Sequence, residues 1–171
     1  VGNTNDGTVN WNYSITEGAL DFLGAGEVVT AVFTITVTDD EGAFATQNVT
    51  ITINGTNDAP TITAVDVAGV ITEGSVLSDT GAVTFADVDL TDRPVATEAT
   101  ATVSAVAQGG GVLVLTGAQQ LAIENAFVIT PAVGNTNDGT VNWNYTITEG
   151  ELDFLGAGEV VTAVFTITVT D

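Results

Sequence analysis

The sequence has 171 residues, 44% of them hydrophobic, which is enough for a packed core and excludes a disordered acidic tail. Its 22 acidic residues face one basic residue, Arg93, and the formal charge of −21 makes nucleic acid and anionic membranes poor partners. Because His, Cys and Lys are absent, nucleophilic triads and imidazole chemistry are excluded, and we expect no enzyme activity.

A long internal repeat dominates the sequence. The segment 1–39 returns as 133–171, a shift of 132 positions, and only Ser14/Thr146 and Ala19/Glu151 differ. So close a repeat indicates a tandem array of recently duplicated copies.

The first predicted element is a strand at 9–16, with the sequence VNWNYSIT. Its apolar residues alternate with polar ones, which is the pattern of a half-buried antiparallel strand. Trp11 and its repeat Trp143 fall on the apolar face, so we interpret both as core residues.

Further along the chain, alternating patterns predict strands at 33–38 and 49–54, joined in a hairpin by the turn Asp39-Asp40-Glu41-Gly42. The same reasoning predicts strands at about 61–67, 81–86, 101–107 and 111–116. One short helical turn is expected at 117–126, capped by Thr116, with Leu121 and Ile123 facing inward.

The motif Asn57-Asp58-Ala59-Pro60 follows a strand and precedes another, and Pro60 cannot donate to a sheet ladder there. We therefore predict a linker at 56–60. Residues 1–55 would be the C-terminal half of one repeat, and 61–171 most of the next, without its final strand. Such incomplete sandwiches predict either a window of a longer array or completion by neighbouring copies.

Two motifs resemble known families. FTITVTDDEGAFATQNVTITINGTNDAP (33–60) resembles the end of a cadherin-type domain, and LDFLGAGE (20–27 and 152–159) is similar to the VCBS repeats of giant bacterial adhesins of the RTX type. The resemblance implies an all-β fold, an antiparallel Greek-key β-sandwich of cadherin or immunoglobulin-like type, in tandem array. It also implies a secreted or cell-surface bacterial protein, often one of biofilm or attachment.

Acidic residues near the linker form a candidate calcium site, because calcium takes six to eight oxygen ligands in irregular geometry. Asp87 and Asp89 lie at a strand end with the spacing that points both carboxylates the same way. The full candidate set resembles a cadherin junction, with the DxD element, the linker and the acid before the last hairpin. Its members are Asn57, Asp58, Asp87, Asp89, Asp171, Asp39, Asp21 and Glu27.

Some positions depart from the cadherin pattern. Gly55 stands where a linker acid is usual and Ala59 where an Asn is usual, which predicts fewer ions or weaker binding. Glu73 resembles an early-strand Glu that serves the next junction, with Asp153 and Glu159 as its partners.

Each piece also has an ordinary explanation. A DxD pair at a strand end is often surface charge, Asn5-Asp6-Gly7 suits a tight turn, and Arg93 could pair with Asp89 or Asp92. For the set as a whole, the unscreened negative charge favours metal.

Three functions remain open from the sequence. The first is a structural spacer of a secreted or cell-surface adhesin or filament, stiffened by calcium at the junctions between repeats and contacting neighbouring repeats. The second is a module that recognises glycans or proteins. The third is a filament subunit assembled by strand exchange between copies.

Overall fold

The computed structural model describes residues 6–171, and of Ala64 the backbone alone. The chain divides into two compact units, Val1–Thr56 and Asn57–Asp171, referred to below as the first and second unit. The division falls within the segment that the sequence marks as a linker.

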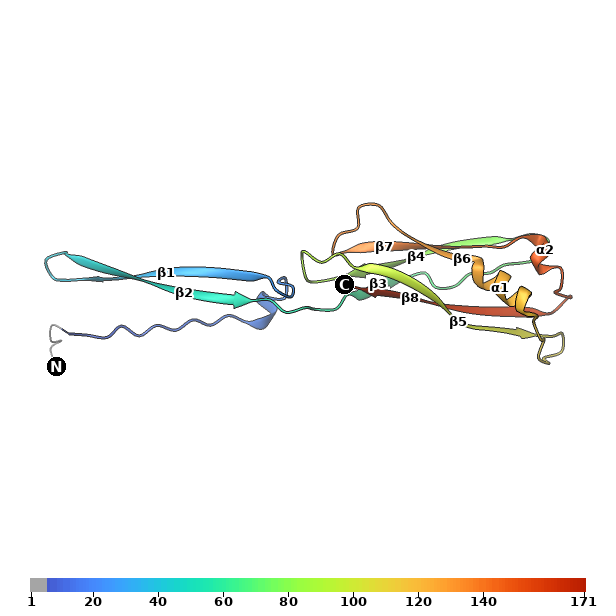
Figure 1. Cartoon of the computed structure of the whole chain (residues 1–171), viewed down its shortest axis with the longest axis horizontal. Helices are drawn as coiled ribbons and strands as arrows, with labels where there is room; N and C mark the ends of the chain where they lie inside the picture. The colour runs from blue at the N-terminus through green and yellow to red at the C-terminus, as the bar shows by residue number, and fades with distance from the viewer. Residues whose placement is uncertain (1–5) are drawn as a thin grey trace. The chain divides into compact units, whose positions relative to one another are not determined.

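The first unit is built on one long hairpin. Strands β1 (Val28–Thr38) and β2 (Phe44–Asn54) pair antiparallel from end to end, after a 3-10 turn η1 (Glu17–Ala19) (Figure 1). The hairpin turns at the predicted Asp39-Asp40-Glu41-Gly42, where Gly42 has φ of 89° and Asp39 Oδ1 accepts from the amides of Glu41 and Ala43. Glycine adopts this backbone conformation without strain, so the turn chemistry agrees with its sequence.

The second unit contains two antiparallel sheets. The larger has the order β3-β4-β7-β6 and the smaller pairs β5 with β8 (Figure 1). The strands are β3 (Thr61–Val65), β4 (Ser78–Ala86), β5 (Val95–Val106), β6 (Phe127–Pro131), β7 (Gly139–Thr146) and β8 (Val160–Thr170). Two helices, α1 (Gly117–Asn125) and α2 (Glu149–Leu152), complete the unit. The expected all-β, antiparallel, sandwich-like fold is confirmed.

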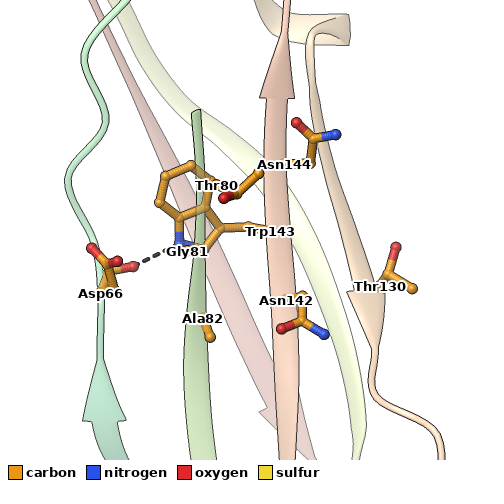
Figure 2. Close-up of a pocket in the computed structure, with 8 residues that line it drawn as sticks. All are labelled: Asp66, Thr80, Gly81, Ala82, Thr130, Asn142, Trp143 and Asn144. Atoms are coloured by element: carbon orange, nitrogen blue, oxygen red, sulfur yellow. Dashed lines mark hydrogen bonds between the residues drawn. The ribbon is translucent and has the colours of Figure 1, made fainter. Parts of the chain in front are cut away.

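Aromatic side chains join the two sheets of the second unit. The rings of Phe127 on β6 and Phe165 on β8 stack with centroids 4.2 Å apart. Val141 and Trp143 on β7 are buried in the same core, as the alternation of the sequence predicts. Trp143 lies across Gly81 of the neighbouring strand β4, and its indole N–H donates to the carbonyl of Asp66 at 2.6 Å (Figure 2). A side chain at position 81 would collide with the ring, so only glycine permits this packing.

Helix α1 lies where the sequence places it. The Thr116 hydroxyl accepts from the amide of Gln119, and the Gln119 side chain accepts from the amide of Thr116, forming a capping box. Ile123 is buried, but the prediction for Leu121 was wrong, since 55% of it is exposed. Residues two apart on a helix lie on opposite sides, so both could not face inward.

Two predicted strands are absent from the described residues. The segment 111–116 makes one isolated bridge, between Val106 and Val112. The segment 9–16 forms no strand, although its repeat forms β7, and Trp11 is 56% exposed where Trp143 is 6% exposed. β7 pairs with β4 and β6 on its two sides, whereas the described part of the first unit supplies no strand for 9–16. The alternating sequence pattern predicts which face of a strand is buried only where neighbouring strands are present to pair with it.

Candidate metal centre

The register of the second unit brings several acidic residues to one end. β3 and β4 pair at Thr61 and Ala86, so the residues before β3 lie beside those after β4. β5 and β8 pair at Val95 and Thr170, so the residues before β5 lie beside the residue after β8. Acidic residues that precede β3, follow β4, precede β5 or follow β8 therefore lie beside one another in pairs, each pair at one end of its sheet.

We call Asp87, Asp89, Asp92 and Asp171 the Asp87 cluster. One carboxylate oxygen from each of Asp87, Asp92 and Asp171 lies within 4.8 Å of the others. Oxygens bound to a single calcium ion at about 2.4 Å can be at most about 5 Å apart, so the three could share one ion. Asp89 adjoins them, because its amide donates to Asp87 Oδ1 at 3.0 Å.

The linker residues are tied to the same cluster. The amide of Asp58 donates to Asp89 Oδ2 at 2.8 Å, and Asn57 Nδ2 donates to Asp171 Oδ2, also at 2.8 Å. Five predicted residues, Asn57, Asp58, Asp87, Asp89 and Asp171, thus meet within one hydrogen-bonded group. These bonds orient the carboxylates that remain available to a cation.

Two carboxylates of the cluster are buried with an oxygen that accepts no hydrogen bond from the described residues. Asp89 is 0% exposed and Asp87 is 4% exposed, and the oxygens in question are Asp89 Oδ1 and Asp87 Oδ2. A buried polar atom without a partner costs about 1–3 kcal/mol, and more when it is charged. A cation bound by these oxygens removes that cost, and an all-oxygen donor set suits calcium.

Two residues at this site were missed by the sequence reading. Asp92 supplies one of the three convergent oxygens, and Asn137 Nδ2 donates to the backbone carbonyl of Asp87 at 2.7 Å. Asp92 was signalled by its place in the run DVDLTD, and Asn137 by the repeat of Asn5-Asp6-Gly7 as Asn137-Asp138-Gly139. Asn5 itself lies outside the described residues.

Arg93, the one basic residue of the sequence, stabilises the loop that carries the cluster. Its guanidinium donates to the backbone carbonyls of Leu90, at 3.3 Å, and of Asp92. Both bonds lie within the loop that connects β4 to β5.

Three other predicted ligands belong to the first unit. Glu27 Oε2 accepts from the amide of Gly24 and closes the LDFLGAGE loop, of which Asp21 is the second residue. Asp39 accepts two amides of its own turn. That these residues serve a junction stays a prediction.

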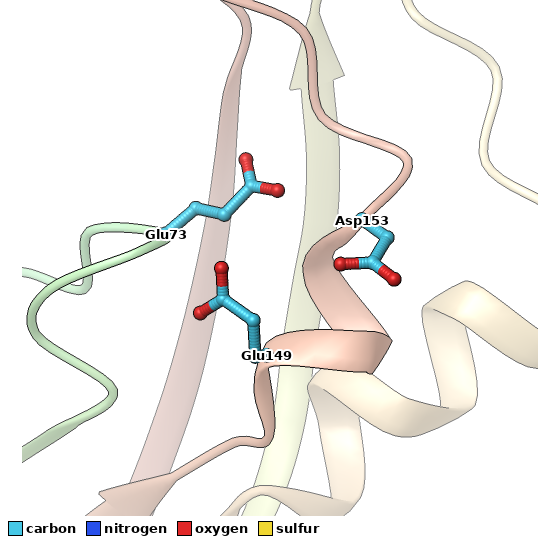
Figure 3. A group of neighbouring side chains, drawn as sticks. All are labelled: Glu73, Glu149 and Asp153. Carbon is cyan, nitrogen blue, oxygen red and sulfur yellow. The ribbon is translucent and has the colours of Figure 1, made fainter.

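A second group of acids, the Glu73 cluster, consists of Glu73, Glu149 and Asp153. One oxygen from each lies within 4.8 Å of the others, and all three residues are exposed (Figure 3). The predicted pair Glu73 and Asp153 does come together here. Glu149 was missed, although the motif ITEG occurs at 15–18, 71–74 and 147–150. The predicted partner Glu159 instead accepts from the amide of Gly156 at 2.8 Å.

No protein-family model matches the chain, and neither does any curated protein. Among the described residues, no helix has the length and apolar character needed to cross a bilayer.

Proposed function

We propose that this protein is a structural spacer of a secreted or cell-surface adhesin or extracellular filament, and that calcium bound at the Asp87 cluster makes it rigid. The observation that carries the proposal is the pair of buried carboxylate oxygens without a hydrogen-bond partner, Asp87 Oδ2 and Asp89 Oδ1.

The charge of the chain supports a cation-dependent role. A formal charge of −21 destabilises any compact state by self-repulsion, and divalent cations at acidic clusters offset it. Extracellular calcium modules bind at about 10⁻⁴ to 10⁻³ M, a range that extracellular fluids saturate and the cytosol does not.

The repeat supports the spacer role. Tandem units transmit stiffness through their neighbours, and each unit contributes approximately additively to stability. With neither His, Cys nor Lys, the chain carries little catalytic chemistry, whereas alternating Thr-rich strands suit a scaffold.

The proposal is tested by thermal unfolding of the whole chain with a chelator and with calcium. At 10 mM calcium, a dissociation constant of 10⁻⁴ to 10⁻³ M gives about 1.4–2.7 kcal/mol of added stability by mass action. We expect the melting temperature to rise accordingly, and magnesium to act less because it requires tighter octahedral geometry.

Calorimetric titration of the parent chain and of Asp87→Asn locates the ion. Loss of calcium heat in Asp87→Asn, with retention in the exposed Glu98→Gln control, is the expected result. Identical melting curves in chelator and in calcium would rule out the proposal.

A further inference from the structure

The loop that joins β6 to β7, residues 132–138, contacts the Asp87 cluster through the side chain of Asn137. The amide nitrogen of this side chain donates to the backbone carbonyl of Asp87 at 2.7 Å. The three convergent carboxylates are those of Asp87, Asp92 and Asp171, which lie outside the loop. The loop therefore acts on a candidate ligand through the main chain of that residue.

A second set of contacts fixes the shape of this loop. Asn135 Oδ1 accepts from the amide of Thr140, and Asn135 Nδ2 donates to the carbonyl of Thr140, both at 3.0 Å. Only glycine fits at Gly139, because a Cβ there would lie 2.5 Å from Phe85 Cζ and from Asn135 Cγ. Since the residues on both sides of Asn137 are held in this way, the loop itself keeps the Asn137 amide in position.

The bond from Asn137 fixes the main chain from which the Asp87 carboxylate extends. Strand β4 ends at Ala86, so Asp87 is the first residue beyond it. Asp87 Oδ1 accepts from the amide of Asp89 at 3.0 Å, and Asp87 Oδ2 is buried without a hydrogen-bond partner in the described chain. Hydrogen bonds that orient a metal ligand change the metal affinity by about 10- to 100-fold when they are removed.

A sequence motif marks the two asparagines that donate to the cluster. The tripeptide Thr-Asn-Asp occurs at 4–6, 56–58 and 136–138. In the second copy, Asn57 Nδ2 donates to Asp171 Oδ2 at 2.8 Å, and so occupies a carboxylate oxygen that an ion could use. In the third copy, Asn137 donates to a backbone carbonyl and leaves Asp87 Oδ2 available. Removal of the Asn137 donor therefore separates positioning from competition for a ligand oxygen.

We propose that Asn137 is a positioning residue for the cation of the Asp87 cluster, acting through the backbone carbonyl of Asp87. The inference rests on the proposed calcium site and adds a residue that contacts the ion only through another. The coupling is reciprocal, because a bond that strengthens ion binding is strengthened by the ion by the same factor. Calcium should therefore order the loop between β6 and β7.

Calcium titrations of the whole chain, followed by amide shifts in NMR spectra up to about 50 mM, measure the affinity. Asn137→Leu keeps a similar side-chain size and removes the donor, so its dissociation constant should be at least about tenfold higher than that of the parent. Asn142→Leu is the matched control, because Asn142 is exposed on β7 and lies outside the cluster. Its dissociation constant should stay within about twofold of the parent's. Thermal unfolding in chelator verifies that both variants fold.

The side-chain amide of Asn137 gives a second measurement, on the parent chain alone. Its protons should exchange with water at least about threefold more slowly in calcium than in chelator, because the ion strengthens the bond to Asp87. The side-chain amide of Asn142 should exchange at the same rate in both conditions. If Asn137→Leu does not fold, these rates decide, and equal rates for Asn137 in calcium and in chelator overturn the proposal.

The titrations distinguish failure of this inference from failure of the calcium site. A parent chain without saturable calcium shifts would contradict both. If the parent binds calcium and Asn137→Leu binds it within about twofold as tightly, the positioning role alone is overturned. It is also overturned if Asn137→Leu lowers the melting temperature equally in chelator and in calcium, because a purely structural bond acts alike in both.

Discussion

At the residue scale, one of the two differences between the repeats, Ala19/Glu151, has a local structural effect. In the second unit Glu151 accepts from the amide and hydroxyl of Thr148, at 3.0 and 2.8 Å, and caps α2. In the first unit Ala19 occupies that position, Thr16 has no side-chain cap, and the segment is the 3-10 turn η1. One carboxylate therefore separates a capped helical turn from a 3-10 turn.

This cap predicts a pH dependence. The bonds from Thr148 lower the pKa of Glu151 from its ordinary 4.5. A lowered folded-state pKa contributes stability above the ordinary pKa, and this is lost as the pH falls through the lowered value. We expect Glu151→Ala to reduce the melting temperature at pH 7 and to match the parent at pH 2, measured by circular dichroism. Glu151→Gln can still accept the bonds from Thr148, so its melting temperature at pH 7 should lie between those of the parent and Glu151→Ala. If Glu151→Ala lowers the melting temperature equally at pH 7 and pH 2, the capping role of the Glu151 carboxylate is contradicted.

The buried Asp89 predicts opposite effects with and without calcium. In chelator, Asp89→Asn should raise the free energy of unfolding by about 1 kcal/mol or more, because a buried charge is removed while an oxygen remains for the amide of Asp58. On adding calcium, the free energy of unfolding of Asp89→Asn should increase much less than that of the parent. Urea unfolding under both conditions measures the change, with Glu98→Gln as the control of equal charge. If Asp89→Asn is less stable than the parent both in chelator and in calcium, removal of the buried charge does not stabilise the folded state.

At the element scale, the pairing of β4 with β7 includes one close contact, between Gly81 and Trp143. A Cβ at Gly81 would lie 2.5 Å from the Trp143 ring, so the ring or the strand would have to move. We expect Gly81→Ala to destabilise the second unit by about 1–3 kcal/mol, as overpacking does. Denaturant unfolding followed by tryptophan fluorescence, to which Trp143 and the already exposed Trp11 both contribute, checks the value.

The matched control for this prediction is Gly117→Ala. Position 117 begins helix α1 and has open space around it, so alanine should be neutral or stabilising by up to about 1 kcal/mol. Equal losses from the two substitutions would mean that the Trp143 contact does not determine the packing.

At the scale of the whole molecule, identical sequences have different environments. In the described part of the first unit only Leu23 and Gly24 are buried, whereas the second unit has a core that includes Ile123, Val141 and Ile147. Since local stability follows buried apolar contact, the first unit should open more readily.

Hydrogen exchange followed by NMR tests this difference within one sample. Amides of the even-numbered residues of β8, which bond to β5, should exchange at least tenfold more slowly than the odd-numbered amides of β1, which bond to β2. The compared amides belong to different positions of the shared sequence, so each rate is divided by its intrinsic rate for the unfolded chain before the comparison. Equal protection would indicate that the two units have equal stability.

The sequence by itself determined the all-β character, the hairpin turn at Asp39-Asp40-Glu41-Gly42 and the cap of α1, because alternation, turn residues and caps act over a few neighbouring positions. It also indicated Asn57, Asp58, Asp87, Asp89 and Asp171, since acids at strand ends of a sandwich can be paired by position. Tertiary structure alone decided that Asp92 joins them, that Asp89 is fully buried, and that the segment of Trp143 forms a strand while that of Trp11 does not. The reason is that burial depends on which strands lie alongside, and the same 39 residues cannot encode two sets of neighbours.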